Sequence, residues 1–324
     1  MLGILVVHSD FFALGAPTQE ECARNPYLSC WRIGIESISV ISVNLFVLLS
    51  GWYGIRPKKM RLLEFLFQIL FFNVLFFIVF SFIIPDRTFT RDGIGSLFML
   101  DKRFWFVKAY LLLYILSPVL NDFCQNAKQR QYLFILTGFF LFQMVYGWLF
   151  PSVSWFKMGY STISFIGIYL LAAYLRRYYT GGGNNEKALL LFVYIAFIIV
   201  NTALIFCSVY YFNGAYNQRL IAYNSPLVMT ASVAVFLLFT KVSFKSIWVN
   251  YVAVSSFAAF LFHGNHFFVD EVYVAYIKKI FDGDTFAIFS LKTLFFILII
   301  FTVAICVDKI RIWIWERISS KMVF

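Results

Sequence analysis

The sequence predicts an all-α, polytopic membrane helix bundle of about ten transmembrane helices. Of its 324 residues, 61% are hydrophobic and only 13% are charged, whereas roughly a quarter of the residues in soluble domains are charged. The apolar residues form long runs such as ALLLFVYIAFIIVNTALIFCSVYY (188–211), and about 20 apolar residues cross a bilayer as a helix. These runs do not alternate apolar with polar residues, as the strands of a membrane barrel would, so the spans are predicted to be helical.

Proline, glycine and charged clusters divide the chain into apolar segments joined by short loops. The segments cover 1–15, 34–55, 63–84, 104–120, 132–150, 161–175, 188–211, 225–240, 249–268 and 284–307. We find no signal peptide with a cleavage site, no internal repeat and no soluble domain, and only TGGGNNEK (180–187) has the composition of a flexible loop. The sequence therefore predicts a single transmembrane domain over 1–324.

Positive charge indicates the orientation of the chain. If the N-terminus is cytoplasmic, the cytoplasmic loops and tail hold 15 Lys and Arg residues and the outer loops hold 10, with RPKKMR (56–61) as the clearest cluster. Lys and Arg are retained on cytoplasmic loops, so both termini are predicted to be cytoplasmic. The net charge of +11 then reflects topology and attraction to anionic lipid rather than nucleic-acid binding.

Two of the five cysteines, Cys22 and Cys30, share the first polar loop. They could form a disulfide if this loop faces an oxidising compartment, and free thiols are the alternative. Their spacing does not match a zinc site.

Ionisable residues within spans are costly and usually face a cavity or the protein interior. In the predicted orientation, separate segments bring such residues toward the outer membrane surface. They are His8, Asp10, Glu36, Arg103, Lys108, His263, His266 and Asp270. His263 and His266 are three residues apart, and His266 and Asp270 are four apart, so each pair is expected on one helical face. The convergence of imidazole, carboxylate and cation at one depth favours a functional site.

Each of these residues also has a simpler interpretation. A histidine in a span can merely hydrogen-bond a neighbouring helix, His266 can be an interfacial residue, and Lys108 can extend to the headgroups. Glu36 can pair with Arg32, four residues earlier in the sequence. A third metal ligand beside the two C-terminal histidines is not evident, so no metal is predicted.

Four patches of the sequence resemble the acyltransferase-3 family of integral membrane acyltransferases. They are VNLFVLLSGWYGI (43–55), FWFVKAYLLLYILSPVLN (104–121), GYSTISFIGIYLLAAYLRRY (159–178) and YNSPLVMTASVAVFLLF continuing to SSFAAFLFH (223–263). Their order and spacing agree with the family over nearly the whole chain, in the stand-alone type found in bacterial surface-glycan gene sets.

The resemblance implies a multi-pass enzyme of the bacterial cytoplasmic membrane. Such enzymes transfer an acyl group, usually acetyl, from cytoplasmic acyl-CoA to a hydroxyl of a sugar or lipid-linked glycan. His8 matches the family's histidine in the first helix. The arginine that precedes this histidine in the family would fall before Met1, so the chain is expected either to begin earlier or to have lost that arginine. Some relatives carry a soluble domain after the last helix, and none is expected after RISSKMVF.

O-acylation requires a base for the hydroxyl proton and a donor for the tetrahedral oxyanion. Imidazole titrates near neutrality, so His8 is the predicted base. Asp10 lies on roughly the opposite helix face, which makes Glu36 the better candidate to orient that imidazole. His263 is the third predicted catalytic residue, placed to hold the acyl carbonyl or the sugar.

Two further sets of residues are predicted to bind the substrates. The substrate-binding candidates are Arg103, Trp105, Lys108 and Tyr114. The candidates for the CoA phosphates are Arg56, Lys58, Lys59 and Arg61, although simple topology charges explain each of them equally well. The expected partners are acetyl-CoA, a glycan acceptor and membrane lipid.

A membrane transporter or flippase for a glycan or glycolipid is the competing functional class, because a bundle of about ten helices with a polar cluster also fits such a protein. Repeated halves with broken helices and cations along a central cavity would favour it, and the sequence shows neither. A non-catalytic relative of the family is the third class. The sequence indicates no oligomeric state, acyl group or particular sugar.

Overall fold

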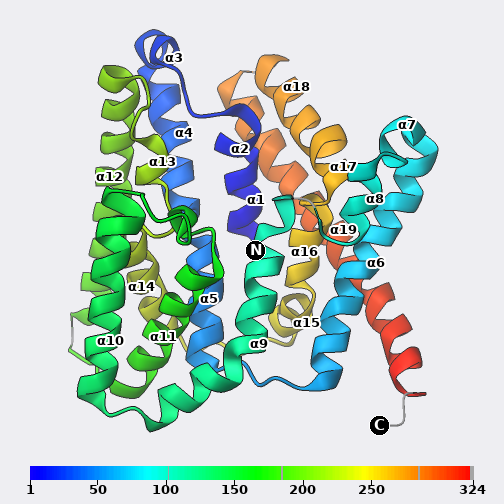
Figure 1. Cartoon of the computed structure of the whole chain (residues 1–324). Coiled ribbons are helices and arrows are strands. Elements are labelled where there is room, and N and C mark those ends of the chain that lie inside the picture. The colour runs from blue at the N-terminus through cyan, green and yellow to red at the C-terminus, as the bar shows by residue number, and fades with distance from the viewer. Residues whose placement is uncertain (101, 184, 284, 322–324) are drawn as a thin grey trace. The chain divides into compact units, whose positions relative to one another are not determined.

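The computed structural model describes residues 1–100, 102–183, 185–283 and 285–321 (Figure 1). Within these residues the regular elements are all helices, so the predicted all-α fold class is confirmed. Asn184 of the glycine-rich stretch and Asp284 at the start of the last predicted segment lie outside the described residues.

The chain divides into two compact units. Unit 1 consists of Met1–Leu14, Lys58–Phe104 and Phe244–Phe324, and unit 2 consists of Gly15–Pro57 and Trp105–Ser243. The single transmembrane domain over 1–324 stays a prediction.

Unit 1 is built from three separate stretches of sequence. Its helices are α1 (Leu2–Ser9), α2 (Phe11–Leu14), α6 (Lys59–Ile83), α7 (Pro85–Thr88), α8 (Arg91–Leu97), η1 (Lys102–Phe104), α15 (Ile247–Val254), α16 (Ser256–His263), α17 (His266–Phe268), η4 (Val269–Val274), α18 (Ala275–Gly283) and α19 (Phe286–Ser319). Helix α16 packs against α1, α6 and α19. Buried residues of unit 1, including Leu5 of α1, Tyr273 of η4 and Ile297 of α19, form a hydrophobic core.

Unit 2 contains the remaining helices. They are α3 (Gln19–Arg24), α4 (Pro26–Ser39), α5 (Ser42–Tyr53), α9 (Trp105–Asn126), α10 (Gln129–Phe142), η2 (Gln143–Leu149), η3 (Lys157–Gly159), α11 (Thr162–Tyr178), α12 (Glu186–Phe212), α13 (Asn217–Leu220) and α14 (Pro226–Thr240). Helix α11 packs against α5, α9 and α10, and α12 packs against α4 and α14. A Cβ on Gly51 would lie 2.3 Å from the carbonyl O of Tyr169, so only glycine permits the close approach of α5 to α11.

Six helical stretches of the described chain are long and apolar enough to cross a membrane. They are Pro26–Tyr53, Lys59–Ile83, Trp105–Asn126, Gln129–Leu149, Glu186–Phe212 and Phe286–Ser319. Ile247–His263 and His266–Gly283 add a seventh if this pair, bent by 59°, forms one span. Leu2–Leu14 and Pro226–Thr240 are apolar but shorter. Within the described residues, each segment expected from the sequence is mainly helical, while the count of about ten spans and the cytoplasmic termini stay predictions.

The helix bounds differ from the predicted ones where polar residues continue a helix. The first polar loop is largely helical, because the side chain of Asn25 accepts a hydrogen bond from the N–H of Leu28 and Pro26 begins α4. Cys22 and Cys30 are free thiols in this structure. Cys22 is buried in α3, and this burial raises the pKa of its thiol, which lowers its reactivity toward disulfide formation.

Helix α19 continues well past the predicted end at 307 because its polar residues are paired. Asp308 is fully buried and accepts hydrogen bonds from Gln68 on α6 and from Arg311, one turn further along α19. Arg311 also donates to Glu64 on α6, at 3.2 Å. This cluster ties α19 to α6 within unit 1, so Arg311 is not the solvated tail cation that the charge count assumed.

Candidate active site

Two histidines that are far apart in the sequence form a hydrogen-bonded pair in unit 1. His8 lies in the last turn of α1, and His263 is the last residue of α16. Nε2 of His263 lies 2.9 Å from Nδ1 of His8. His263 is fully buried, whereas His8 is partly exposed. The structure therefore brings together two of the three predicted catalytic residues.

The hydrogen bonds of this pair define which ring nitrogens carry protons when both residues are neutral. Nδ1 of His263 lies 2.5 Å from the carbonyl O of Ala259, which can only accept a hydrogen bond. Nδ1 of His263 is therefore the donor, and its Nε2 is an acceptor. His8 must then donate from its own Nδ1, which leaves a lone pair on Nε2 of His8. No described residue hydrogen-bonds that Nε2, so it can accept a proton as a general base.

Neighbouring rings and a tyrosine hold the pair in place. The hydroxyl of the fully buried Tyr273 donates to the carbonyl O of Leu5 at 2.6 Å, which anchors α1 one turn before His8. The Tyr273 ring also lies 5.5 Å from the His263 ring, centroid to centroid. Phe12 stacks on His8 with centroids 4.7 Å apart. These contacts restrict the rotation of both imidazoles.

A helix break directly after His263 sets the end of α16. Gly264 directly follows the last residue of α16, and a Cβ there would crowd the carbonyl O of Phe260, at 2.9 Å. Asn265 then caps α17 by accepting from the N–H of Phe267 at 3.0 Å. The prediction that His263 and His266 share a helical face is wrong, because the helix ends between them. Within the described residues, no group of three or more His, Cys, Asp or Glu side chains is placed to hold a metal ion.

Arg103 of unit 1 pairs with residues beyond this helix break. It donates to Asp270 at 2.9 Å and to the carbonyl O of His266 at 3.0 Å. Arg87 donates to the same carboxylate at 2.5 Å and also to Glu271. Arg103, expected to bind substrate, is thus tied into an ion-pair cluster, and its substrate role stays a prediction.

Trp105 belongs to an aromatic cluster in unit 2. Its ring lies 4.6 Å from that of Tyr160 and 5.8 Å from that of Tyr223, and the two tyrosine rings are 4.7 Å apart. Both tyrosine hydroxyls lie close enough to Glu36 to interact electrostatically with its carboxylate. The carboxylate of Glu36 is only 2% exposed. Aromatic faces beside a carboxylate can hold the C–H groups and hydroxyls of a sugar.

Backbone contacts bring the two tyrosines of this cluster together. The N–H of Tyr223 donates to the carbonyl O of Met158 at 3.1 Å. Gly159 has a φ of +93°, and a Cβ there would lie 2.6 Å from Cβ of Tyr223. Asn44 on α5 donates to the carbonyl O of Tyr223 at 2.9 Å. The segment that precedes α11 is thereby hydrogen-bonded to the segment that precedes α14.

The other predicted substrate-binding residues follow Trp105 along α9. Lys108 is exposed, and Tyr114 is partly buried about 1.7 turns further on. Of the residues predicted to bind CoA phosphates, Arg56 belongs to unit 2, whereas Lys58, Lys59 and Arg61 belong to unit 1.

A polar cavity of about 490 Å³ lies at the C-terminal ends of α5, α9 and α11 in unit 2. Arg176 and Arg177 line it, and they donate to the carbonyl O atoms of Trp52 and of Cys124 and Gln125, respectively. Arg pairs can bind phosphate. The sequence analysis did not single out these two arginines as candidates for a site, although they are adjacent in the sequence RRYY.

Hydrogen bonds hold the loop after α5 in place beside this cavity. The hydroxyl of Tyr169 accepts from the N–H of Ile55 at 2.9 Å and donates to Asn121 at 2.6 Å. The amide of Asn121 in turn donates to the carbonyl O of Ile55 at 2.7 Å. Both backbone polar groups of Ile55, its N–H and its C=O, are therefore hydrogen-bonded, which fixes the loop after α5.

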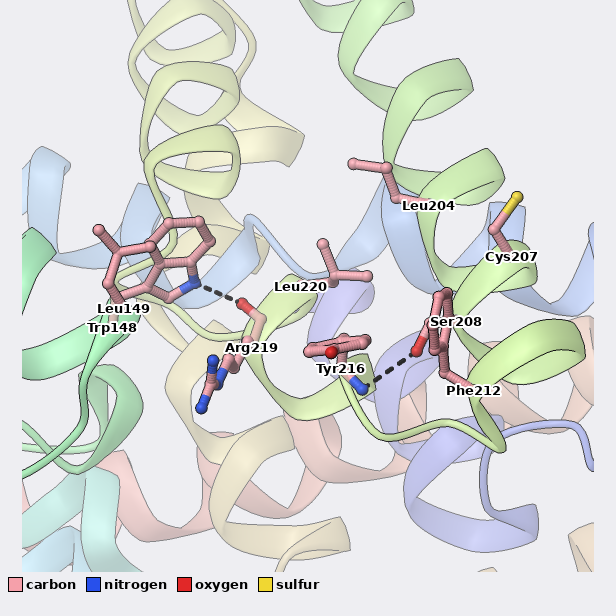
Figure 2. A pocket seen from close by; sticks show the side chains of 9 residues that line it. All are labelled: Trp148, Leu149, Leu204, Cys207, Ser208, Phe212, Tyr216, Arg219 and Leu220. Atoms are coloured by element: carbon pink, nitrogen blue, oxygen red, sulfur yellow. Dashed lines mark hydrogen bonds between the residues drawn. The ribbon is translucent and has the colours of Figure 1, made fainter.

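A second cavity of unit 2, of about 300 Å³, is almost wholly apolar (Figure 2). Trp148 donates from its indole to the carbonyl O of Arg219 at 2.7 Å, and the N–H of Tyr216 donates to Ser208 at 3.1 Å. The cavity therefore has few polar groups to orient a substrate.

The sequence interpretation missed Tyr160 and Tyr223 as partners of Trp105. Each stands at the start of a patch that resembles the acyltransferase-3 family, GYSTIS and YNSP. Aromatic residues are so frequent in this chain, however, that these positions alone could not be distinguished from core or interfacial ones.

Comparisons with known proteins agree with the resemblance of the sequence patches. A search of curated proteins and a search of solved structures both return no match. The family model described as an acyltransferase domain matches residues 1–311. Since it covers nearly the whole chain, this multi-pass protein belongs to the acyltransferase-3 family of membrane acyltransferases.

Proposed function

We propose that the protein is a membrane-bound O-acyltransferase of the bacterial cytoplasmic membrane. It transfers an acyl group, acetyl in our assignment, from cytoplasmic acyl-CoA to a hydroxyl of a cell-surface or lipid-linked polysaccharide. The observation that carries this proposal is the His8–His263 pair, whose hydrogen bonds leave Nε2 of His8 ready to accept a proton. Acyl transfer in general is supported by the family.

In the proposed reaction, Nε2 of His8 removes the proton of the acceptor hydroxyl as the oxygen attacks the thioester carbonyl carbon. The C–O bond forms and the carbonyl π-electrons move to oxygen, which gives a tetrahedral oxyanion. When this intermediate collapses, the C–S bond breaks and the thiolate takes the proton from the His8 imidazolium. The products are the O-acyl ester and free CoA thiol, and His8 returns to its neutral state.

His263 acts as the positioning residue in this scheme. Both its ring nitrogens are engaged, by Ala259 and by His8. It therefore orients His8 and accepts a hydrogen bond from the imidazolium that forms, as the acid of a catalytic triad does. Neutral His8 has one N–H and donates it to His263, so the carboxylate of Glu36 is assigned to the hydroxyls of the acceptor rather than to His8. Lys108 is our candidate donor to the acyl carbonyl or the sugar.

The acceptor sugar is assigned to the aromatic cluster of Trp105, Tyr160 and Tyr223, with Tyr114 and Arg103 as further contacts. Sugar rings present C–H groups that pack on aromatic faces, and their hydroxyls donate well to a buried carboxylate such as Glu36. The short distances within the cluster support this assignment.

The CoA phosphates are assigned to basic residues of the inner loops. The set predicted from sequence is Arg56, Lys58, Lys59 and Arg61. The polar cavity beside α11 adds Arg176 and Arg177. Guanidinium groups bind phosphate in two-point geometry, which supports including the two arginines.

The decisive experiment compares His8→Ala with the unchanged chain in cells that carry the acceptor glycan. Glycan acetylation is measured by mass shift, and free thiol release from acyl-CoA is measured in membranes containing each form. We expect His8→Ala to abolish both signals. His266→Ala, which removes an imidazole outside the His8–His263 pair, is the matched control and should keep both.

Full acetylation with His8→Ala would exclude this residue as the base. Absence of thiol release from the unchanged protein, together with glycan movement across the membrane, would instead assign it to the transporter class.

A further inference from the structure

A third cavity of unit 2 lies among α10, η2, α11 and the start of α14. Its volume is about 560 Å³. Leucine, phenylalanine and methionine side chains supply most of its lining, with Thr137, Gln143, Tyr174, Asn224 and Thr230 as the polar members. No Lys, Arg, His, Asp or Glu is among the described residues that line it. A ligand with a net charge would therefore be buried there without a counter-charge, which is unfavourable.

The amide of Gln143 is the unusual group in this cavity. Gln143 is 2% exposed, and its buried Oε1 has no hydrogen-bond partner within the described residues. It is the first residue of the π-helical turn η2 (Gln143–Leu149). Such turns are rare and occur frequently at functional sites. A buried amide is normally hydrogen-bonded, so an unpaired one that lines a cavity indicates a partner from outside the chain.

Asn224 provides a second unpaired oxygen. Its Nδ2 donates to the carbonyl O of Gly147 at 3.0 Å, which defines its other side-chain atom as the oxygen. That Oδ1 is buried and has no partner within the described residues. The cavity therefore offers the amide of Gln143, which can both donate and accept a hydrogen bond, and Oδ1 of Asn224, which can accept one. A hydroxyl group satisfies both kinds of partner, because it donates one hydrogen bond and accepts others.

The rim of the cavity is apolar and accessible. Leu133 is 49% exposed and Leu141 is 54% exposed, and both lie on α10, a helix of a candidate membrane span. In a membrane such a rim faces hydrocarbon. The chain of a lipid can therefore enter across these leucines while its polar end reaches Gln143.

We propose that this cavity binds an uncharged lipid whose hydrocarbon chain ends in a hydroxyl group, with the hydroxyl hydrogen-bonded to Gln143 and Asn224. The absence of a cation among the described lining residues excludes a phosphate or carboxylate as the preferred group at this depth. The site is independent of the proposed acyl transfer, because it shares no residue with the groups assigned to that reaction.

The test uses three photoreactive probes with the same diazirine-bearing alkyl chain. One ends in a hydroxyl, one in a phosphate and one in a methyl group. The purified full-length protein in lipid nanodiscs is irradiated with each probe, and labelled peptides are quantified by mass spectrometry. We expect the alcohol to label 133–144 and 224–233 more than the alkane, by about 2- to 12-fold for each of the two added hydrogen bonds, and more than the phosphate.

Gln143→Met removes the amide at nearly constant side-chain length. It should reduce alcohol labelling toward the level of the alkane, because only the hydrogen bond to Asn224 remains. Alkane labelling should stay unchanged, which also reports an intact cavity. Gln131→Met, at an exposed position on the preceding helix α10, is the matched control and should change neither. Equal labelling by all three probes, preferred labelling by the phosphate, or an undiminished alcohol preference in Gln143→Met would each overturn the proposal.

Discussion

Replacing His263 by leucine tests how the histidine pair works. The side chain of His263 is fully buried, and its Nε2 accepts the Nδ1–H of His8 over 2.9 Å. Leucine is apolar and fits a buried position, but it cannot accept a hydrogen bond. In His263→Leu, the His8 imidazole is free to place its proton on Nε2, the nitrogen that has to act as base.

The expected size of the effect follows from the lost hydrogen bond. One such bond contributes about 0.5–1.5 kcal/mol, which is a factor of about 2 to 12 at 25 °C. We therefore expect His263→Leu to lower kcat by roughly that factor through the wrong tautomer and orientation. His8→Ala should lower it by about 10²- to 10⁴-fold, the usual contribution of a general base.

A double-variant cycle makes this reasoning refutable. If His263 acts only through His8, adding His263→Leu to His8→Ala should cause no further loss, because the group to be oriented is gone. His263→Gln should restore part of the activity, since its amide oxygen can still accept from His8. The assay is thiol release from acyl-CoA in nanodiscs. Additive losses in the double variant, or a single His263→Leu loss as large as that of His8→Ala, would refute the positioning role.

Three further predictions concern stability and the two substrates. Arg311→Met should lower the free energy of unfolding by about 3–5 kcal/mol, because it leaves Asp308 buried without its cation. The double variant Asp308→Asn/Arg311→Met should recover most of this stability. Thermal denaturation in detergent measures both effects. Equal losses in both variants would contradict this. Trp105→Leu should raise KM for the acceptor about 2- to 12-fold with little change in KM for acyl-CoA, since aromatic contacts contribute about 0.5–1.5 kcal/mol. Arg177→Gln should raise KM for acyl-CoA by at most about 5-fold, because an exposed charge contributes no more than about 1 kcal/mol. An unchanged KM for acyl-CoA would exclude Arg177 from the donor site.

Local properties of the chain account for what could be predicted from the sequence. Every apolar segment is mainly helical within the described residues, because the length and continuity of an apolar run decide this without reference to the rest of the chain. The predicted helix bounds were wrong or incomplete where one or two residues interrupt or extend a helix. Gly264 and Asn265 break the helix between His263 and His266, and Asn25 and Pro26 extend α4 into the first polar loop.

Some features of the candidate site were also visible in the sequence. His8 is an imidazole in an apolar run, and such a group is costly unless it is used or paired. His263 stands out for the same reason. Composition and spacing could not show that the two rings are in direct contact, because 255 positions separate them.

The sequence by itself determined the class of this protein, its helices and the histidines worth testing, because hydrophobicity and side-chain chemistry are properties of each residue and its neighbours. The tertiary structure alone decided the partners. It joined His8 to His263, Trp105 to Tyr160 and Tyr223, and Asp308 to Gln68. Contacts between distant helices depend on how helix faces pack, and many packings satisfy one hydrophobic pattern.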